Sequence, residues 1–516
     1  MKTGKDMKKR DTKEKDGKNS TGLDRRGFLK SGTALAGCGL FPEAAFGSDE
    51  CPVPPPSFSL RKKRPALAGL TGEKAPNILL IITDQERWRG NLPSLARPAF
   101  DRLCENGVSF DNAFCSYPLC SPSRSSIFSG MYPHQNGVTN NLIFPVGQEE
   151  LDPRMPHIGS VLASAGYRIG YKGKWDLSKS RDYYLANLNN RGRASDYGFE
   201  WHCENPPNQE YGYIADDEVV RQACDWIGEQ SHDRPWFLCC SIINPHDICH
   251  PRLKPDDTVR PEAKLPGNLK DDLLDKPADQ KERRDNDLAR LKKILNPTGK
   301  SPHEYKERDW KKFLTFYYDL IEMTDKYIEQ LLYALHRNGM TDDTIIFYTS
   351  DHGELGGAHG FKGKYEFYEE ALHIPMVVSH PKIDRSGVSA MVSNISIAPT
   401  MASMAGVEWP ADIPGRDLSG WITGDGGPDE EAVFSEHETN IRIGQYYNAG
   451  RMVRTRRWKY SYSFYDVQDG QLYDLDSDPL EMRNLFHDPG HRKIRKELEE
   501  VLRSWQRETG DHLKLP

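Results

Sequence analysis

Three short apolar runs, far apart in the chain, constrain the fold more than any other feature of this 516-residue sequence. They are Asn77–Ile82, Trp236–Ile243 and Thr344–Thr349. A continuous apolar run of this length is typical of a strand that is buried on both faces. Helical patterns lie between the runs, and the clearest is Trp310–Leu335, with an apolar stripe along one face. Buried strands that alternate with helices predict an α/β fold with a large, mostly parallel sheet flanked by helices.

Polar side chains follow each run at the point where the strand is expected to end. Asp84 and Gln85 follow the first run, His246 follows the second, and Asp351 and His352 follow the third. Because ligands bind beyond the carboxyl ends of parallel strands, these side chains are predicted to share one site. A single Asp would carry little weight, since Asp commonly begins a turn. Together the three endings indicate oxygen and nitrogen ligands for a metal ion.

The segment Cys120–Arg124 places a thiol, a proline and a guanidinium within the sequence Cys-Ser-Pro-Ser-Arg. Proline fixes the backbone and the serine hydroxyls can cap a helix, so the segment predicts a tight turn that enters a helix. The N-terminus of a helix offers free N–H groups and a positive dipole. The segment therefore also predicts a place for an anion.

This segment resembles the signature of the type I, formylglycine-dependent sulfatases of the alkaline phosphatase-like superfamily, in which Cys-x-Pro-Ser-Arg is followed by a glycine, here Gly130. In that family the cysteine is oxidised to formylglycine (3-oxoalanine), and the hydrated aldehyde is the nucleophile. The resemblance implies this modification at Cys120 and a formylglycine-generating enzyme as a partner. It also implies a smaller antiparallel sheet in a C-terminal subdomain.

The same resemblance assigns five residues to a divalent metal site: Asp84, Gln85, modified Cys120, Asp351 and His352. Ca²⁺ is the usual ion of the family. Many members have a second Asp at the position of Gln85 and an Asn at that of His352. Because an imidazole nitrogen is a softer ligand than oxygen, Mn²⁺ is the alternative ion.

The resemblance also assigns the positive groups around the sulfate. Arg124 would bind two sulfate oxygens or hold the nucleophile, and Lys174 would contact the sulfate. His246 corresponds to a histidine of the sulfate pocket, and Lys364 to a lysine that assists the leaving group. Asp176 stands where the family usually has a histidine, so three alternatives stay open for it: a base, a side chain that faces away, or the mark of an altered substrate.

The resemblance extends over nearly all of the chain after Pro76. It implies a catalytic domain over residues 76–424 and a C-terminal subdomain over 425–516. In the subdomain, alternating segments such as Arg454–Tyr462 predict antiparallel strands, and a helix is expected over Arg492–Thr509. A charged insertion over about 251–307 is interpreted as a solvated surface element, with a lid over the pocket as the alternative.

The N-terminal segment is read as targeting sequence rather than fold. Residues 1–47 resemble a twin-arginine export signal, with Arg25 and Arg26 before a short apolar stretch, and residues 48–75 read as a disordered linker. Cys38 lies in a stretch that resembles a lipoprotein cleavage box. The chain is therefore expected to pass through the twin-arginine machinery and to be periplasmic or secreted, either soluble or lipid-anchored at Cys38.

The function implied by the resemblance is hydrolysis of a sulfate ester, with a sulfated carbohydrate as the expected substrate. The formal net charge of −7 argues against a nucleic-acid-binding protein, which would carry a basic face. Two alternatives stay open: a phosphonate monoester or phosphodiester hydrolase on the same scaffold, and a non-catalytic binder of sulfated glycans.

Overall fold

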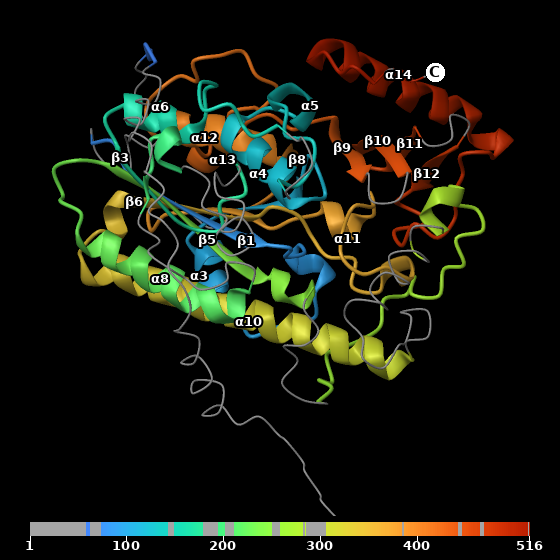
Figure 1. Cartoon of the computed structure of the whole chain (residues 1–516), viewed down its shortest axis with the longest axis horizontal. Helices are drawn as coiled ribbons and strands as arrows, with labels where there is room; N and C mark the ends of the chain where they lie inside the picture. The colour runs from blue at the N-terminus through green and yellow to red at the C-terminus, as the bar shows by residue number, and fades with distance from the viewer. Residues whose placement is uncertain are drawn as a thin grey trace, which may run out of the picture. The chain divides into compact units, whose positions relative to one another are not determined.

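The structure is a computed structural model, and the chain folds as three layers in which helices cover both faces of a large sheet (Figure 1). The structure describes residues 58–61, 74–142, 149–178, 194–201, 211–249, 258–281, 284, 306–383, 386–441, 446–464, 469–513 and 515. The expected export signal, Cys38 and most of the expected linker lie outside these residues.

The large sheet has eight strands in the order β4-β3-β5-β1-β6-β7-β2-β8. Their bounds are β1 Asn77–Asp84, β2 Gly107–Phe114, β3 Arg168–Gly173, β4 Glu200–Trp201, β5 Trp236–Pro245, β6 Thr344–Ser350, β7 Met376–Ser379 and β8 Ser386–Ser393. Only β7 runs antiparallel to its neighbours among these strands. The predicted fold class, a mostly parallel sheet with helices on its faces, is confirmed.

The central strand β1 is buried on both faces, which explains its unbroken apolar sequence. Ile78, Leu80 and Ile82 belong to the core on one side of the sheet. Leu79 and Ile81 belong to the core on the other side. Since successive side chains of a strand point to opposite faces, a strand between two helical layers needs apolar residues at every position. The same reasoning accounts for β5 and β6, which flank β1.

Helices α4, α6 and α12 lie on one face of the sheet, and α3, α8 and α10 lie on the other (Figure 1). Their bounds are α3 Pro98–Glu105, α4 Cys120–Ser129, α6 Ile158–Ser164, α8 Gly212–Gly228, α10 Glu307–Arg337 and α12 Ile397–Met404. The predicted helix over Trp310–Leu335 is α10. Its buried face includes Phe313, Ile321, Ile328 and Leu335, at helical spacing.

Shorter helical turns connect these elements. They are η1 Arg89–Asn91, α5 Pro133–Asn136, η2 Ala194–Tyr197, η3 His246–Cys249, η6 Thr341–Asp343, η7 Ala358–Gly360, α11 Glu369–Leu372, η8 Asn394–Ser396, α13 Ser419–Thr423 and η9 Pro489–His491. The turn η3 follows β5 directly, so its first residues lie at the carboxyl end of the sheet, where ligands bind in such folds.

A second sheet of four antiparallel strands, in the order β12-β11-β10-β9, forms the C-terminal part. Its elements are β9 Ala432–Ile441, β10 Tyr446–Thr455, β11 Trp458–Ser463, β12 Gly470–Asp474 and the helix α14 Arg492–Thr509. Leu498, Leu502 and Trp505 of α14 pack on this sheet. The predicted helix has the bounds of α14, whereas Arg454–Tyr462 spans a turn and two strands. The proposed domain boundary near residue 424 stays a prediction.

The insertion was expected to be a solvated surface element, but part of its described residues is buried in the structure. Asn268, Asp271, Leu273, Lys276 and Gln280 are all buried. The side chain of Asn268 donates to Glu370, and that of Gln280 donates to Glu366. Lys276 donates to the carbonyl of Met482, which belongs to the C-terminal part.

The insertion therefore joins the loop that follows β6 to the C-terminal part of the chain. Asp271 and Lys276 can be buried because they pair with His359 and with the carbonyl of Met482, respectively. The helix suggested by Leu288, Leu291 and Leu295 lies outside the described residues.

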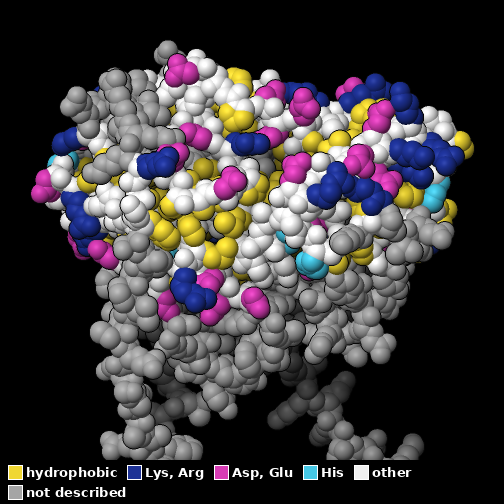
Figure 2. Space-filling model, turned by 90° about the horizontal axis from the view of Figure 1, so that it is seen from above, with side chains coloured by type: hydrophobic (Ala, Val, Ile, Leu, Met, Phe, Trp, Pro, Cys, Tyr) yellow, Lys and Arg dark blue, Asp and Glu magenta, His cyan; other side chains and the backbone are white. Residues whose placement is uncertain are grey.

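Charges of both signs are mixed on the face seen in Figure 2, where Lys and Arg side chains lie among Asp and Glu. A nucleic-acid-binding face would show a continuous basic patch instead. Among the described residues, no helix combines the length and the apolar character needed to cross a membrane.

A buried pair of charges, His134 on α5 and Glu436 on β9, joins α5 to the second sheet. Nδ1 of His134 lies 2.5 Å from Glu436 Oε2, and the backbone N–H of His134 donates to Glu436 Oε1 at 2.7 Å. Burial alone would lower the pKa of His134, but the Glu436 carboxylate raises it above its usual value. Because the folded pKa is raised, the stabilisation is fully present below pH 6.5 and is lost as the pH rises through the folded pKa.

We therefore expect His134→Gln to lower the thermal unfolding midpoint more at pH 5.5 than at pH 8.5, by about 2 °C. His487→Gln, at a histidine that is 69% exposed in its side chain, is the matched control and should show no such difference. Equal losses at both pH values would contradict a charged His134.

Candidate active site

The predicted site residues come together at the carboxyl ends of the central strands. Asp84 is the last residue of β1, and Asp351 follows β6 directly. Lys174 follows β3, and His246 follows β5. Each of these strands runs parallel to its neighbour in the series β3-β5-β1-β6, so their ends meet at one edge of the sheet.

Cys120 reaches this edge from the first turn of α4. The helix begins at Cys120 itself, with Leu119 as N-cap, so Cys120–Arg124 is the first turn of the helix rather than a turn before it. Gly130 ends the helix in the left-handed conformation at φ 72°, which favours glycine. Ser123 donates to the backbone carbonyl of Asp351 and accepts from Asn394 at 2.8 Å, and these bonds hold the helix over the strand end.

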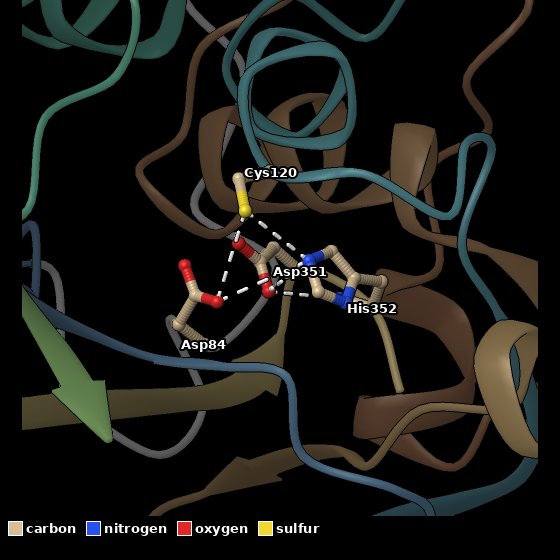
Figure 3. A group of neighbouring side chains, drawn as sticks. All are labelled: Asp84, Cys120, Asp351 and His352. Carbon is tan, nitrogen blue, oxygen red and sulfur yellow. Dashed lines mark hydrogen bonds and ion pairs between the residues drawn. The ribbon is translucent and has the colours of Figure 1, made fainter. Parts of the chain in front are cut away.

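Asp84, Cys120, Asp351 and His352 form a compact buried cluster, with one ligand atom of each within 4.8 Å of the others (Figure 3). Cys120 points from α4 toward the two carboxylates and the imidazole. Its Sγ lies 3.4 Å from His352 Nε2 and 3.8 Å from Asp84 Oδ1. All four residues are at most 1% exposed. The repulsion between two carboxylates buried side by side must be offset by positive charge between or beside them.

The donor set fits a hard divalent cation. Carboxylate oxygens are the ligands that Ca²⁺ prefers, and His352 offers one imidazole nitrogen through Nε2. Nδ1 of His352 lies 2.9 Å from the carbonyl oxygen of Gly353, so a hydrogen bond there fixes the ring with Nε2 toward the cluster.

Gln85 lies beside the cluster, in a left-handed backbone conformation with φ 74°. Its backbone N–H donates to Asp351 at 3.1 Å, and its side-chain Oε1 accepts from Lys364 at 2.9 Å. Its amide nitrogen donates to Glu354. The side-chain oxygen of Gln85 therefore contacts Lys364, and its side-chain nitrogen holds the buried Glu354.

Arg124 is fully buried, and its guanidinium spans the two carboxylates. Nε donates to Asp351 at 2.8 Å, and Nη2 to Asp84 at 3.0 Å. Nη1 donates to Ser241 and to the carbonyl of Lys174. Since protein atoms accept from all three nitrogens, the structure favours a role in holding the carboxylates over direct contact with a ligand.

Two lysines bring positive charge to the thiol and the carboxylates. Lys364 Nζ lies 2.9 Å from Cys120 Sγ, and Lys174 Nζ lies 2.6 Å from Asp84 Oδ2. His246 also acts on Asp84 electrostatically. Burial raises the pKa of Asp84, but Lys174, His246, Lys364 and Arg124 together hold it well below its usual value.

The Cys120 thiol is strongly acidified in this setting. Burial and the charge of Asp84 raise its pKa, but Lys174, Lys364 and His352 outweigh them and lower it well below its usual value. A cysteine in such a positive environment at a helix N-terminus is reactive rather than inert. By contrast, Cys239 and Cys240 of β5 are buried in the core, as expected. No disulfide joins the cysteines that the structure describes.

Asp176 faces the site, so the alternative in which it points away is wrong. Its Oδ2 lies 3.2 Å from Lys174 Nζ, and the residue is 7% exposed. The remaining alternatives, a base or the mark of an altered substrate, stay open.

Sequence reasoning gave no role to Ser241 or Glu354, which the structure places in contact with the site. Ser241 is the one hydroxyl in the apolar run of β5, and it accepts from Arg124 at 2.7 Å. Glu354 is wholly buried and accepts from Gln85 and from the backbone of Gly356 and Gly363. A lone polar residue in a buried strand was the available signal for Ser241. The roles assigned to the other site residues stay predictions, although the structure brings all of them together.

The family model "Sulfatase" matches residues 76–407, which is more than half of the chain. A second model, "N-sulphoglucosamine sulphohydrolase, C-terminal", matches residues 357–508.

Curated relatives are similar over most of their length. An N-acetylglucosamine-6-O-sulfatase of Bacteroides thetaiotaomicron is 27% identical over 85% of this chain and 88% of its own. An ulvan-active sulfatase of Formosa agariphila is 28% identical over 85% of this chain and 82% of its own.

Two solved structures show the same fold. A 2-O glycosaminoglycan sulfatase has a TM-score of 0.72 at 24% identity and covers 86% of this chain and 95% of its own. A phosphonate monoester hydrolase of Agrobacterium radiobacter has a TM-score of 0.65 at 22% identity and covers 84% of this chain and 96% of its own.

Proposed function

The chain belongs to the sulfatase family and is a sulfuric ester hydrolase, and we propose that it acts on the sulfate ester of a carbohydrate with Cys120 as the source of the nucleophile. The observation that carries the proposal is the position of the Cys120 thiol, buried between Lys364 and the Asp84–Asp351–His352 cluster. The names of two relatives, an N-acetylglucosamine-6-O-sulfatase and an ulvan-active sulfatase, support a sulfated sugar as the substrate.

Residues of the chain itself would bind and orient the ester. Lys174 would donate to the sulfate oxygens and Lys364 to the leaving oxygen, where negative charge increases in the transition state. Arg124 would keep the two carboxylates in place without contacting the ester, because its nitrogens already donate to protein atoms. The buried site would exclude water and so strengthen each of these interactions.

Two groups that the family uses fit this site. Formylglycine formed from Cys120 would supply the attacking hydroxyl as its hydrated aldehyde. A divalent cation, proposed to be Ca²⁺, would be held by Asp84, Asp351, His352, modified Cys120 and the Gln85 oxygen, and would supply positive charge to the sulfate oxygens and the nucleophile. The oxygen-rich donors favour Ca²⁺, with Mn²⁺ as the alternative because of His352.

The proposed setting of the enzyme follows from its N-terminal sequence. The twin-arginine pattern at Arg25 and Arg26 supports export through the twin-arginine machinery to the periplasm or the exterior, with Cys38 as a candidate lipid anchor. A formylglycine-generating enzyme would be needed before export is complete. Polysaccharide sulfates are extracellular substrates, which agrees with this location.

The test compares substrates on one preparation in which mass spectrometry shows the aldehyde at Cys120. The panel contains sulfated monosaccharides and oligosaccharides, an aryl sulfate, choline sulfate and a phosphonate monoester. We expect the highest kcat/KM for a sulfated sugar. A preparation that hydrolyses the phosphonate monoester faster than every sulfate ester would overturn the proposal in favour of the second activity that this fold supports.

Lys364→Ala is expected to slow alkyl sulfates more than aryl sulfates. A sugar hydroxyl is a poor leaving group and depends on a positive or acidic group, whereas 4-nitrophenolate leaves without such help. We expect a loss of about 100-fold for a sugar sulfate and about tenfold for 4-nitrophenyl sulfate. Equal losses for both substrates would indicate that Lys364 acts on the nucleophile instead. Its Nζ lies 2.9 Å from Cys120 Sγ. Lys382→Ala, at an exposed lysine, is the control.

A further inference from the structure

Asp176 places an additional carboxylate beside the predicted anion pocket. Its Oδ2 lies 3.2 Å from Lys174 Nζ, in a side chain that is 10% exposed. Its backbone adopts φ 54°, in the left-handed region that costs most residues about 1 kcal/mol or more and is tolerated by Asp better than by most. This conformation brings the carboxylate back to the lysine two residues earlier.

The carboxylate changes what Lys174 offers to a ligand. Its ammonium group donates a hydrogen bond to Asp84 at 2.6 Å and forms an ion pair with Asp176 at 3.2 Å. The charge of Lys174 is also balanced by two neighbouring carboxylates, so the lysine attracts an anion less strongly than a lysine with a single acidic partner would.

The effect of a fixed negative charge depends on the charge of the ligand. Coulomb repulsion from Asp176 acts once on an ester with one negative charge and twice on an ester with two. A sulfate monoester, a phosphodiester and a phosphonate monoester each carry one negative charge at neutral pH. A phosphate monoester carries nearly two above its second pKa of about 6.

We infer that Asp176 is a specificity-determining residue, which makes the pocket select esters with one negative charge and reject phosphate monoesters. The inference rests on the proposed function, because it takes Lys174 as a ligand of the ester anion. This role differs from that of a base. The carboxylate weakens the attraction of Lys174 for the anion and repels the anion directly. The selection is by charge, so sulfur and phosphorus esters of equal charge are not separated by this residue.

The experiment compares the metal-loaded, aldehyde-containing wild type with Asp176→Asn at pH 8. Three substrates share one leaving group: 4-nitrophenyl sulfate, 4-nitrophenyl phosphate and the methyl diester of 4-nitrophenyl phosphate. We expect the ratio of kcat/KM for the phosphate monoester to that for the sulfate to rise at least about tenfold in the variant. The ratio for the diester to the sulfate should stay within about twofold.

Asp176→His, which also removes the negative charge, is the second variant and should shift the ratio in the same direction. Asp342→Asn removes an exposed carboxylate from η6, before the amino end of β6, and is the matched control without a shift. An unchanged monoester ratio in both Asp176 variants would overturn the inference. So would an equal rise for the diester, because the residue would then separate phosphorus from sulfur and not charge.

A binding measurement separates this inference from the proposed function. Cys120→Ala, with and without Asp176→Asn, is titrated with phenyl sulfate and phenyl phosphate in the presence of the metal. We expect the Asp176→Asn change to strengthen phenyl phosphate binding at least about tenfold relative to phenyl sulfate. If the aldehyde-containing wild type hydrolyses no sulfate ester while this shift occurs, the proposed function fails and the inference about charge stands. If sulfate esters are hydrolysed and the shift is absent, only the inference fails.

Discussion

Cys120→Ala is expected to lower kcat/KM for every sulfate ester at least about a thousandfold, because the variant has no nucleophile of its own. The reason is that alanine can be neither oxidised to an aldehyde nor deprotonated, whereas the thiol lies 2.9 Å from Lys364 in a site that lowers its pKa. The measurement is kcat/KM on a sulfated sugar and on 4-nitrophenyl sulfate, with the metal content of both proteins determined.

Cys224→Ala is the matched control for this variant. Cys224 is half-buried on α8, on the other side of the sheet from α4, and takes no part in the site. We expect it to retain activity within about twofold. A Cys120→Ala protein that keeps even one tenth of the wild-type rate would contradict a nucleophile derived from Cys120.

Asp351→Asn is expected to lower kcat/KM at least about 100-fold and to reduce the bound divalent metal. The substitution keeps the shape of the side chain but removes a charge that faces both the cluster and Arg124, whose Nε is 2.8 Å away. Arg124 would then retain Asp84 as its only carboxylate partner among the described contacts. The metal content is measured by mass spectrometry after dialysis, and the activity is measured with added Ca²⁺ and with added Mn²⁺.

The control is Asp342→Asn, which should leave both the metal content and the activity unchanged. Recovery of Asp351→Asn by a high concentration of one ion would identify the ion that the site prefers. Full metal content together with full activity in Asp351→Asn would contradict its assignment as a ligand.

The strands and their polar ends could be predicted because burial on both faces leaves a mark in the sequence. The runs that became β1, β5 and β6 have no polar alternation, and Asp84 and Asp351 stand at the carboxyl ends of β1 and β6. Parallel neighbours bring such ends together without further information. The chemistry, hydrolysis of a sulfate ester, was predicted from the resemblance of the cysteine motif to the sulfatase signature.

Other features depend on partners that are distant in sequence, and no local pattern reveals them. The insertion reads as solvated because it is rich in charge, yet Lys276 is buried against Asp275 and the carbonyl of Met482. Arg124 was expected to bind two sulfate oxygens or to hold the nucleophile, and no local pattern predicts its hydrogen bonds to Ser241 and the two carboxylates. The direction of Asp176 depends on a left-handed backbone angle that Asp adopts without a sequence signature.

The most direct test is the release of inorganic sulfate by preparations in which different fractions of Cys120 carry the aldehyde. The fraction is measured by mass spectrometry of the peptide that contains Cys120, and the sulfate by ion chromatography with a sulfated sugar as the substrate. If the buried, positively surrounded Cys120 is the source of the nucleophile, the rate rises in proportion to the aldehyde fraction and extrapolates to zero for unmodified protein. A rate that is independent of this fraction would contradict the mechanism.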